Sequence, residues 1–388
     1  MALKGCGYKV PLICAFGLLG LSSLTPASAS SLVSKVALKK ATVGYATQNG
    51  GTTGGKKAAS KYIYLVSTIS GLKKALTTST SKPRIIQIKG TIDVSGGTDY
   101  TSKSDQKKRS QLKVPSNTTI IGVNSSAGLT NGSLVIYNVK NVIVRNLTIE
   151  SPVDVAPEYE SGDGWNAEWD GLDIKKSKNV WIDHMTFTDG SFTDDQYTTK
   201  NGETYVQHDG ELDITHGSDY ITISNSIFKN HDKTMLIGHS KSNSSEDKGH
   251  FRVTLVNNIF NTIEQRTPRV RFGKIHAYNN YFKGNKKAST YAYKYSFGLG
   301  YKGSILSEKN VFKISNLSKQ CKVVKVFKSN SSLEDNGSKF NGSSLSLSSC
   351  SIPSSSLSWS VPYSYTTRST SSLVTYLNKH SGAGNLSL

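Results

Sequence analysis

The sequence predicts an all-β protein whose short strands stack as a parallel β-helix. A nine-residue pattern first occurs at residues 141–149: strand-forming residues, then Asn or His at the sixth position and an aromatic residue or Ile at the ninth. Clear copies follow at residues 179–187, 220–228, 252–260 and 274–282, with a weaker one at 304–312. The ninth positions are separated by 22 to 41 residues, as expected for coils of about 22 residues that carry inserted loops. Because the sixth and ninth positions keep their phase in five copies, this reading is favoured over a β-sandwich of repeated hairpins.

The segments before the repeat follow from local patterns. Strands are predicted at residues 62–66, 84–94 and 114–123, the second with a turn at Gly90. Residues 67–76 predict a short helix with Leu72, Ala75 and Leu76 on one face. Residues 102–109 are interpreted as a charged loop, and the Ser-rich segment 329–358 as loops and a terminal cap.

The repeated Asn at the sixth position suits a left-handed backbone conformation and a ladder of side-chain amides. In the second copy this position holds His184, directly after Asp183. A catalytic His–Asp pair is one interpretation. A structural hydrogen-bonded role is favoured, because the position belongs to the repeat.

The N-terminus has the pattern of a signal peptide at residues 1–29. Lys4 and Lys9 precede a short apolar run at 11–21, and Ala27-Ser28-Ala29 forms a small-residue cleavage site. We therefore expect an exported, extracellular protein, with residues 30–388 forming a single domain. No other long apolar run occurs, so no membrane partner is expected.

Two of the four cysteines, Cys321 and Cys350, lie beyond the signal segment. An oxidising compartment favours a disulfide between them, closing a Ser-rich loop, over the alternative of two buried free thiols.

The chain is strongly basic. It has 47 Lys and Arg against 27 Asp and Glu, a formal net charge of +20, and loss of Lys4 and Lys9 would leave +18. This charge suggests a polyanionic partner. Nucleic acid, anionic cell-wall polymers and acidic polysaccharide all satisfy the charge, and charge alone does not separate them.

Residues 151–219 break this pattern, because they hold sixteen of the acids and only four lysines. Asp209 and Asp213 stand four residues apart before one predicted strand, and Asp170 precedes another. Stacked coils would bring the three carboxylates together, and such oxygen ligands suit Ca²⁺. Glu168 and Asp173 could extend the site. The alternative is a solvated acidic loop.

A cationic set follows on later coils. It comprises Lys233, Arg266, Arg269 and Arg271. Arg269 and Arg271 alternate as in a strand and are expected to point the same way, while Arg266 is expected in the turn before Pro268. Arginine binds carboxylates in a bidentate manner. A Ca²⁺ site beside these cations therefore predicts a slot for a polycarboxylate chain.

Three motifs together resemble the signatures of polysaccharide lyase family 1, the secreted pectate lyases. They are Trp181-Ile-Asp-His184, Asp232-Lys-Thr-Met-Leu-Ile-Gly238 and Arg266-Thr-Pro-Arg-Val-Arg-Phe-Gly273. The resemblance covers roughly residues 45–350 and is nearest to Bacillus-type enzymes. It implies a right-handed parallel β-helix and Ca²⁺-dependent β-elimination of de-esterified polygalacturonate.

Transferred by motif, the resemblance implies that Asp170, Asp209 and Asp213 bind calcium. It implies that Arg266 removes the C5 proton, while Lys233 and Arg271 bind galacturonate carboxylates. Arginine is a weak base because it is normally protonated, so neighbouring cations would have to lower its pKa, and an alkaline optimum would follow. Lys233 is the alternative base.

Other functions on the same fold stay open at this stage. A pectin lyase would act on methyl-esterified substrate, but the three aspartates argue against it. A hydrolase would need a pair of carboxylates across the scissile bond, and a wall-binding β-helix would need no base. We expect an acidic polysaccharide partner, no nucleic acid and a monomer.

Overall fold

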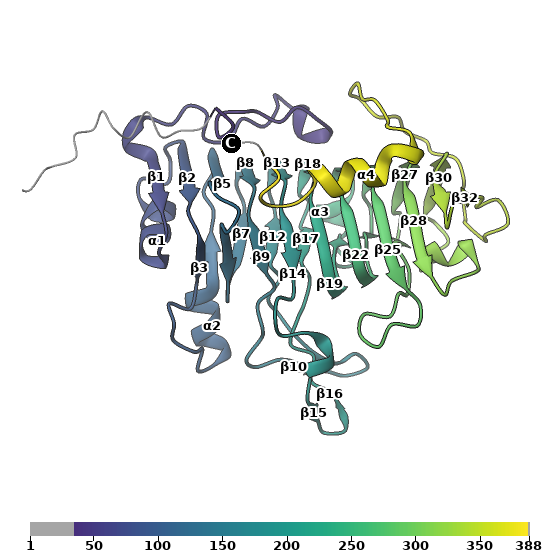
Figure 1. The fold of residues 1–388 in the computed structure, drawn as a ribbon, viewed down its shortest axis with the longest axis horizontal. Coiled ribbons are helices and arrows are strands. Elements are labelled where there is room, and N and C mark those ends of the chain that lie inside the picture. The colour runs from purple at the N-terminus through teal and green to yellow at the C-terminus, as the bar shows by residue number, and fades with distance from the viewer. Residues whose placement is uncertain (1–34, 387–388) are drawn as a thin grey trace, which may run out of the picture.

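The computed structural model describes residues 35–386, and the predicted signal peptide lies outside them. Three long sheets wind around one core as a parallel β-helix, with the coils following one another along its axis (Figure 1). Each coil contributes one strand to each sheet, so stacked residues in adjacent coils are separated by tens of residues in the chain. The fold class predicted from the sequence is confirmed.

The first sheet has ten parallel strands that contain the first part of each repeat. They are β1 (Ile63–Val66), β2 (Arg84–Ile88), β5 (Thr118–Gly122), β8 (Lys140–Arg145), β13 (Lys178–Asp183), β18 (Asp219–Ser224), β21 (Arg252–Val256), β24 (Lys274–Tyr278), β27 (Ser304–Glu308) and β30 (Ser332–Asn336).

The second sheet contains the ninth positions of the repeat, and its final strand pair is antiparallel. Its strands are β3 (Thr91–Asp93), β6 (Gly128–Thr130), β9 (Thr148–Glu150), β14 (Thr186–Thr188), β19 (Ile227–Lys233), β22 (Ile259–Gln265), β25 (Tyr281–Asn285), β28 (Val311–Ser315), β31 (Lys339–Phe340) and β32 (Ser343–Ser344).

The third sheet has eight parallel strands and carries the acidic and cationic motifs. Its strands are β4 (Gln111–Lys113), β7 (Ser133–Tyr137), β12 (Leu172–Lys175), β17 (Leu212–Thr215), β20 (Leu236–Ile237), β23 (Arg269–Val270), β26 (Phe297–Leu299) and β29 (Val324–Val326). Two small hairpins project from the middle of the coil (Figure 1): β10 (Glu158–Glu160) with β11 (Gly164–Asn166), and β15 (Thr199–Lys200) with β16 (Glu203–Thr204).

The turn between the first and second sheets explains the sixth position of the repeat. Its residues have positive φ, from 48° to 57°, at Asn146, His184, Asn225, Asn257, Asn279 and Lys309. Asn tolerates this conformation better than most residues. The expected amide ladder lies one residue later, where Asn258, Asn280 and Asn310 are buried and hydrogen-bonded from coil to coil.

The ninth positions form an interior stack of aromatic rings. The rings of Phe187, Phe228, Phe260, Phe282 and Phe312 are stacked nearly parallel, and neighbouring centroids are 4.6 to 5.0 Å apart. These rings are almost completely buried, and they join the core around which the three sheets wind.

The described part of the chain has four α-helices outside the sheets: α1 (Ile69–Thr77), α2 (Lys103–Ser110), α3 (Ser244–Asp247) and α4 (Thr370–His380). The predicted helix α1 buries Leu72, Ala75 and Leu76, and the Thr68 side chain caps it. Short 3₁₀ turns are η3 (Tyr45–Thr47), η4 (Ser60–Tyr62), η5 (Asp194–Gln196) and η6 (Gln320–Val323). Within residues 35–386, no helix is long and apolar enough to cross a membrane.

The prediction of a charged loop at residues 102–109 is wrong, because the segment forms α2. Ser102 caps this helix by accepting the Asp105 N–H, and Arg109 pairs with Asp105 one turn earlier. The helix has no apolar residues, so hydrophobic periodicity could not predict it. The N-cap residue Ser102 is a helix start signal that the sequence does contain.

Two further elements differ from the predictions. Residues 84–94 form two strands, β2 and β3, that belong to different sheets. Helix α4 was not predicted; it buries Leu373 and Leu377 against Ile259 and Tyr281 on the outside of the second sheet. The predicted disulfide between Cys321 and Cys350 is present, with Cα atoms 5.2 Å apart.

Candidate functional site

Three aspartates from two adjacent coils meet at the third sheet. Asp170 lies just before β12, while Asp209 and Asp213 lie before and on β17. The two strands pair in parallel with Asp173 opposite Asp213, and the Gly210 N–H donates to Asp170 Oδ1 at 2.8 Å. The register of these coils therefore brings together carboxylates that are about forty residues apart.

Burial and mutual repulsion make these carboxylates costly to ionise together. Burial, followed by the charges of Asp213, Asp173 and Asp209, raises the pKa of Asp170 well above its usual value. Burial and the Asp209 charge raise the pKa of Asp213 to about 7. Carboxylates that repel one another in this way are stabilised when a cation lies among them.

Gly210 lies where the carboxylates of Asp170 and Asp213 approach each other. A Cβ atom at this position would lie 2.7 Å from Asp170 Oδ1 and 2.8 Å from Asp213 Oδ1. Hard oxygen donors that converge on a position without a side chain fit Ca²⁺. The residues present therefore fit a calcium ion, held by Asp170, Asp209 and Asp213.

The two possible additional ligands have other partners. Glu168 forms an ion pair with Lys103 of α2 at 2.6 Å. Asp173 is closer to the cluster, since it contributes to the raised pKa of Asp170, but it pairs with Lys175 at 2.9 Å.

Lys233 lies beside the acidic cluster, at the end of β19. Its Nζ is 3.3 Å from Asp209 Oδ1 and donates to Asn166 Oδ1 at 2.8 Å. The side chain is 12% exposed, which leaves it one open side. The ammonium group is thus held between the carboxylate cluster and the hairpin β10–β11.

Arg266 follows β22 and adopts an unusual backbone conformation. Its φ is +60°, and its carbonyl accepts the Met235 N–H from the preceding coil at 2.8 Å. Positive φ at a non-glycine residue is uncommon and concentrates at functional sites. Its Nε is buried without a hydrogen-bond partner among the described residues. The Arg266 charge partly offsets the rise in the pKa of Asp213.

Arg271 completes the set. Its Nη1 donates to the Gly238 carbonyl at 2.7 Å. Burial, and then the charges of Arg269 and Arg266, lower the pKa of Arg271 to about 10. Arg269 lies over the Phe327 ring at 4.0 Å. The six residues singled out from the sequence therefore form one continuous group of three carboxylates and three cations.

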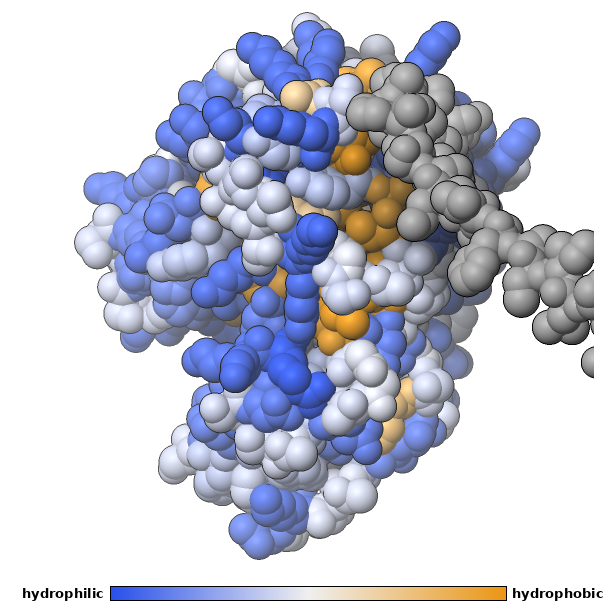
Figure 2. All heavy atoms as spheres, turned by 90° about the vertical axis from the view of Figure 1, so that its left-hand side faces the viewer, coloured by the Kyte–Doolittle hydropathy of each residue, from blue (hydrophilic) through white to orange (hydrophobic). Residues whose placement is uncertain are grey.

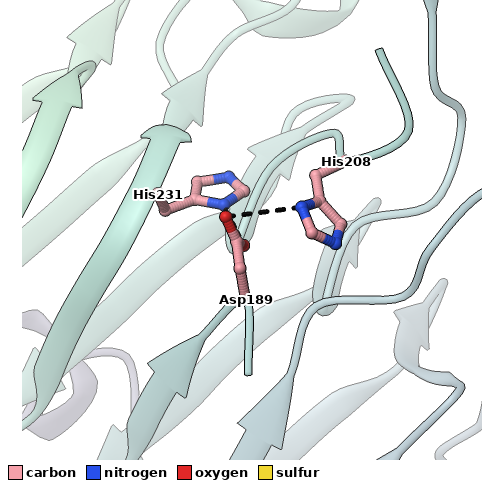
Figure 3. A group of neighbouring side chains, drawn as sticks. All are labelled: Asp189, His208 and His231. Carbon is pink, nitrogen blue, oxygen red and sulfur yellow. Dashed lines mark hydrogen bonds and ion pairs between the residues drawn. The ribbon is translucent and has the colours of Figure 1, made fainter. Parts of the chain in front are cut away.

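A buried cluster that the sequence did not reveal lies next to this site. It consists of Asp189, His208 and His231, whose ligand-type atoms lie within 4.8 Å of one another (Figure 3). Asp189 and His208 lie in the insertion between β14 and β17, His231 lies on β19, and the three have no diagnostic spacing. The one local signal in the sequence is that His208 and His231 are each followed by an Asp.

Asp183 and His184 lie on a different sheet from these groups. Asp183 accepts hydrogen bonds from Arg145 at 2.6 and 2.8 Å and from Ser224 at 2.6 Å, and His184 Nδ1 is 2.8 Å from it. The pair stands at the end of β13 in the first sheet, which agrees with the structural role favoured from the repeat.

Comparison with known proteins gives consistent matches. A family model described as pectate lyase matches residues 10–386. Pectate lyase E of Dickeya chrysanthemi is 54% identical over 367 residues, covering 93% of this chain and 91% of the relative. A pectate lyase of Bacillus subtilis is 33% identical, covering 94% and 97%.

Solved structures agree with these matches. A pectate lyase bound to a hexasaccharide superposes with a TM-score of 0.86 at 31% identity, covering 91% of this chain and all of that one. A pectate lyase from Acidovorax avenae gives a TM-score of 0.80 at 25% identity, covering 89% of this chain and 95% of that one.

Proposed function

Since this chain belongs to the pectate lyase family and is a polysaccharide lyase, we propose that it cleaves α-1,4-linked polygalacturonate by calcium-dependent β-elimination. The observation that carries the proposal is the junction of the Asp170, Asp209 and Asp213 cluster with Lys233, Arg266 and Arg271 on adjacent coils. A polymer with one carboxylate per sugar would meet both a cation site and cationic side chains there.

Asp170, Asp209 and Asp213 would hold Ca²⁺, and the bound ion would supply charge stabilisation for a uronate carboxylate. Lys233 and Arg271 bind substrate carboxylates and orient the sugar. Removal of the C5 proton increases the negative charge on the adjacent carboxylate, so cationic groups stabilise that charge as it develops.

Arg266 removes the C5 proton. The electrons of the C5–H bond form the C4–C5 double bond while the C4–O bond breaks, and the departing oxygen takes up a proton. The products are a new reducing end and a 4,5-unsaturated sugar. A guanidinium is normally protonated, so proton removal by Arg266 requires its neutral form. This mechanism implies that turnover rises with pH into the alkaline range.

The remaining expectations complete the proposal. Residues 1–29 direct export, residues 30–388 act as one domain, and the mature protein works outside the cell as a monomer. Its basic charge serves an acidic polysaccharide and not a nucleic acid, because the cations described above surround a calcium-type carboxylate cluster.

The test is an assay of polygalacturonate with Ca²⁺, monitored by the ultraviolet absorbance of the unsaturated product. We expect absorbance to rise, to stop in excess chelator, and to return when Ca²⁺ is restored. New reducing ends without absorbance would indicate a hydrolase. A strong preference for methyl-esterified pectin without calcium would indicate a pectin lyase, and either result contradicts the proposal.

Arg266→Lys tests the base directly. The substitution keeps a positive charge but replaces the guanidinium with an ammonium group on a shorter side chain. Turnover at saturating substrate should therefore collapse while calcium binding persists. Arg252→Lys is the matched control, because Arg252 pairs with Asp219 on the first sheet, and its turnover should stay near normal. Lys233→Ala should raise KM. A collapse of turnover in Lys233→Ala with normal turnover in Arg266→Lys would assign the base to Lys233.

A further inference from the structure

Outside the carboxylate site lies the buried cluster of Asp189, His208 and His231. We propose that His231 is a positioning residue: oriented by Asp189, it holds the main chain of Asp209 and thereby the shape of segment 209–213. The proposal deepens the proposed function and rests on it, since the segment contains two of the three calcium ligands. No part of it requires His231 to contact substrate.

Hydrogen-bond geometry assigns both protons of the His231 ring. Its Nε2 lies 2.6 Å from the Asp209 carbonyl oxygen, and its Nδ1 lies 2.5 Å from Asp189 Oδ1. A carbonyl oxygen only accepts hydrogen bonds, so Nε2 carries a hydrogen, and a carboxylate is best met by a second N–H. The side chains of His231 and Asp189 are 1% and 0% exposed, so water does not compete.

The electrostatics agree with this assignment. Burial raises the pKa of Asp189, yet His231 and His208 bring it well below its usual value. Asp189 and His231 form a buried ion pair with charge-assisted hydrogen bonds, which are stronger than neutral ones.

Asp189 is itself held by residues from other segments. Its Oδ2 accepts a hydrogen bond from the Tyr291 hydroxyl at 2.7 Å and lies 3.3 Å from His208 Nδ1. The Tyr291 hydroxyl in turn accepts the Asp194 N–H at 3.1 Å. A carboxylate fixed on both oxygens cannot turn, so it sets the plane of the His231 ring.

Strand β19 contacts Asp209 twice. His231 and Lys233 are two residues apart on this strand and therefore lie on the same face. His231 binds the Asp209 main chain at 2.6 Å, whereas Lys233 Nζ lies 3.3 Å from the Asp209 carboxylate. One strand thus determines both where the Asp209 backbone runs and where its side chain points.

A metal ion in the cluster is the competing explanation, because two imidazoles and a carboxylate converge (Figure 3). Both nitrogens of His231 already have partners, however. Two ligand atoms on one tetrahedral zinc ion, each at about 2.0–2.1 Å, are separated by roughly 3.3 Å. The 2.5 Å separation of His231 and Asp189 is that of a hydrogen bond.

The experiment compares His231→Leu and His231→Gln with a matched buried histidine, His276→Leu. His276 lies on the first sheet, where its nitrogens are 2.7 Å from the Tyr363 hydroxyl and 2.8 Å from Glu308. Hydrogen–deuterium exchange in chelator should rise at residues 209–213 in His231→Leu but not in His276→Leu. Unchanged exchange at 209–213 would overturn the proposal whether or not calcium binds.

Calcium titration by calorimetry is the second readout. Loss of a charge-assisted hydrogen bond predicts that the Kd for Ca²⁺ rises about tenfold in His231→Leu. His231→Gln should restore much of the lost Ca²⁺ affinity, because an amide N–H can reach the Asp209 carbonyl. Turnover of His231→Leu at saturating Ca²⁺ should approach normal, whereas a catalytic role would keep it low and overturn the proposal.

Two controls separate the possible failures. Wild-type protein that cleaves polygalacturonate and binds Ca²⁺, with His231→Leu equal to it in both readouts, would refute the positioning role and leave the proposed function intact. Wild-type protein without lyase activity would refute the proposed function, while the exchange experiment still decides the positioning role. Stoichiometric Co²⁺ binding that His208→Leu abolishes would identify a metal site and overturn the proposal.

Discussion

Gly210 lies between Asp170 and Asp213, where even one methyl group would occupy the space on which the carboxylates converge. Its own φ is not in the left-handed region, so alanine is permitted by the backbone and any effect comes from crowding. The absence of a side chain at this residue is therefore part of the proposed calcium site.

Gly210→Ala is expected to weaken calcium binding about tenfold, equivalent to about 1.4 kcal/mol, because the carboxylates must move apart. Calorimetric titration with Ca²⁺ measures the effect. Thermal unfolding in chelator is the control, and it should change little. An unchanged Kd would show that the ion does not occupy the space beside Gly210.

Asp183 illustrates a residue whose importance is structural. Its buried carboxylate accepts hydrogen bonds from Arg145, Ser224 and Asn225. Burial raises its pKa, but His184 and Arg145 outweigh this and lower the pKa to about 2. This value is below the usual value of about 3.9 for Asp in an unfolded chain, so the ionised group stabilises the fold above about pH 4.

Asp183→Asn should lower the free energy of unfolding by about 3 kcal/mol at neutral pH, because Arg145 is left buried without its partner. The difference from wild type should narrow as the pH falls from about 4 to about 2, where the native carboxylate becomes protonated. Urea unfolding at several pH values measures both effects. Asp99→Asn, an exposed site, is the control, and a difference independent of pH would contradict the assignment.

The aromatic stack acts at the scale of the strands. One ring from each of β14, β19, β22, β25 and β28 faces the interior, and each ring contacts the next coil. Because a single coil cannot bury its own apolar face, stability depends on these contacts between neighbours. The same stacking sets the register that aligns β12 with β17 at the carboxylate cluster.

Phe260→Ala, in the middle of the stack, should lower the free energy of unfolding by about 3–5 kcal/mol, through lost burial and the cavity left behind. Phe260→Leu retains much of the volume and should cost clearly less. Denaturant unfolding monitored by circular dichroism provides the measurement. Equal losses for the two substitutions would mean that the planar ring contacts, and not the filled volume, dominate.

At the scale of the whole molecule, many acids are paired with cations within an otherwise basic chain. Several acids of residues 151–219 are neutralised by cations, as Glu158 by Lys103, Asp183 by Arg145 and Asp219 by Arg252. The outer surface is largely hydrophilic, with apolar atoms between, as Figure 2 shows for the end of the coil at which the described chain begins. The excess of Lys and Arg over Asp and Glu favours attraction of an anionic polymer.

Salt should weaken substrate capture more than chemistry. Screening shortens the range of the field from about 30 Å at 0.01 M to about 8 Å at 0.15 M, so KM for polygalacturonate should rise several-fold over that range. The kcat value should stay nearly constant at a fixed, saturating Ca²⁺ concentration. Initial rates at a series of NaCl concentrations test this, and a KM that does not respond to salt would contradict electrostatic capture.

The sequence by itself determined the coil and singled out the residues of the candidate site. The repeat identified the β-helix because each coil must place apolar side chains at the same positions to build a shared core. The local motifs identified Asp170, Asp209, Asp213, Lys233, Arg266 and Arg271, because each chemical type is visible within a short stretch.

Tertiary structure alone decided which distant residues touch. The left-handed Arg266 depends on contacts with adjacent coils, and helix α2 forms without any apolar pattern. Asp189 and His208 lie in the insertion between β14 and β17 and meet His231 of β19 in the fold, and no spacing in the chain encodes that approach. Hydrogen-bond directions and burial arise from packing between coils, which a linear pattern does not contain.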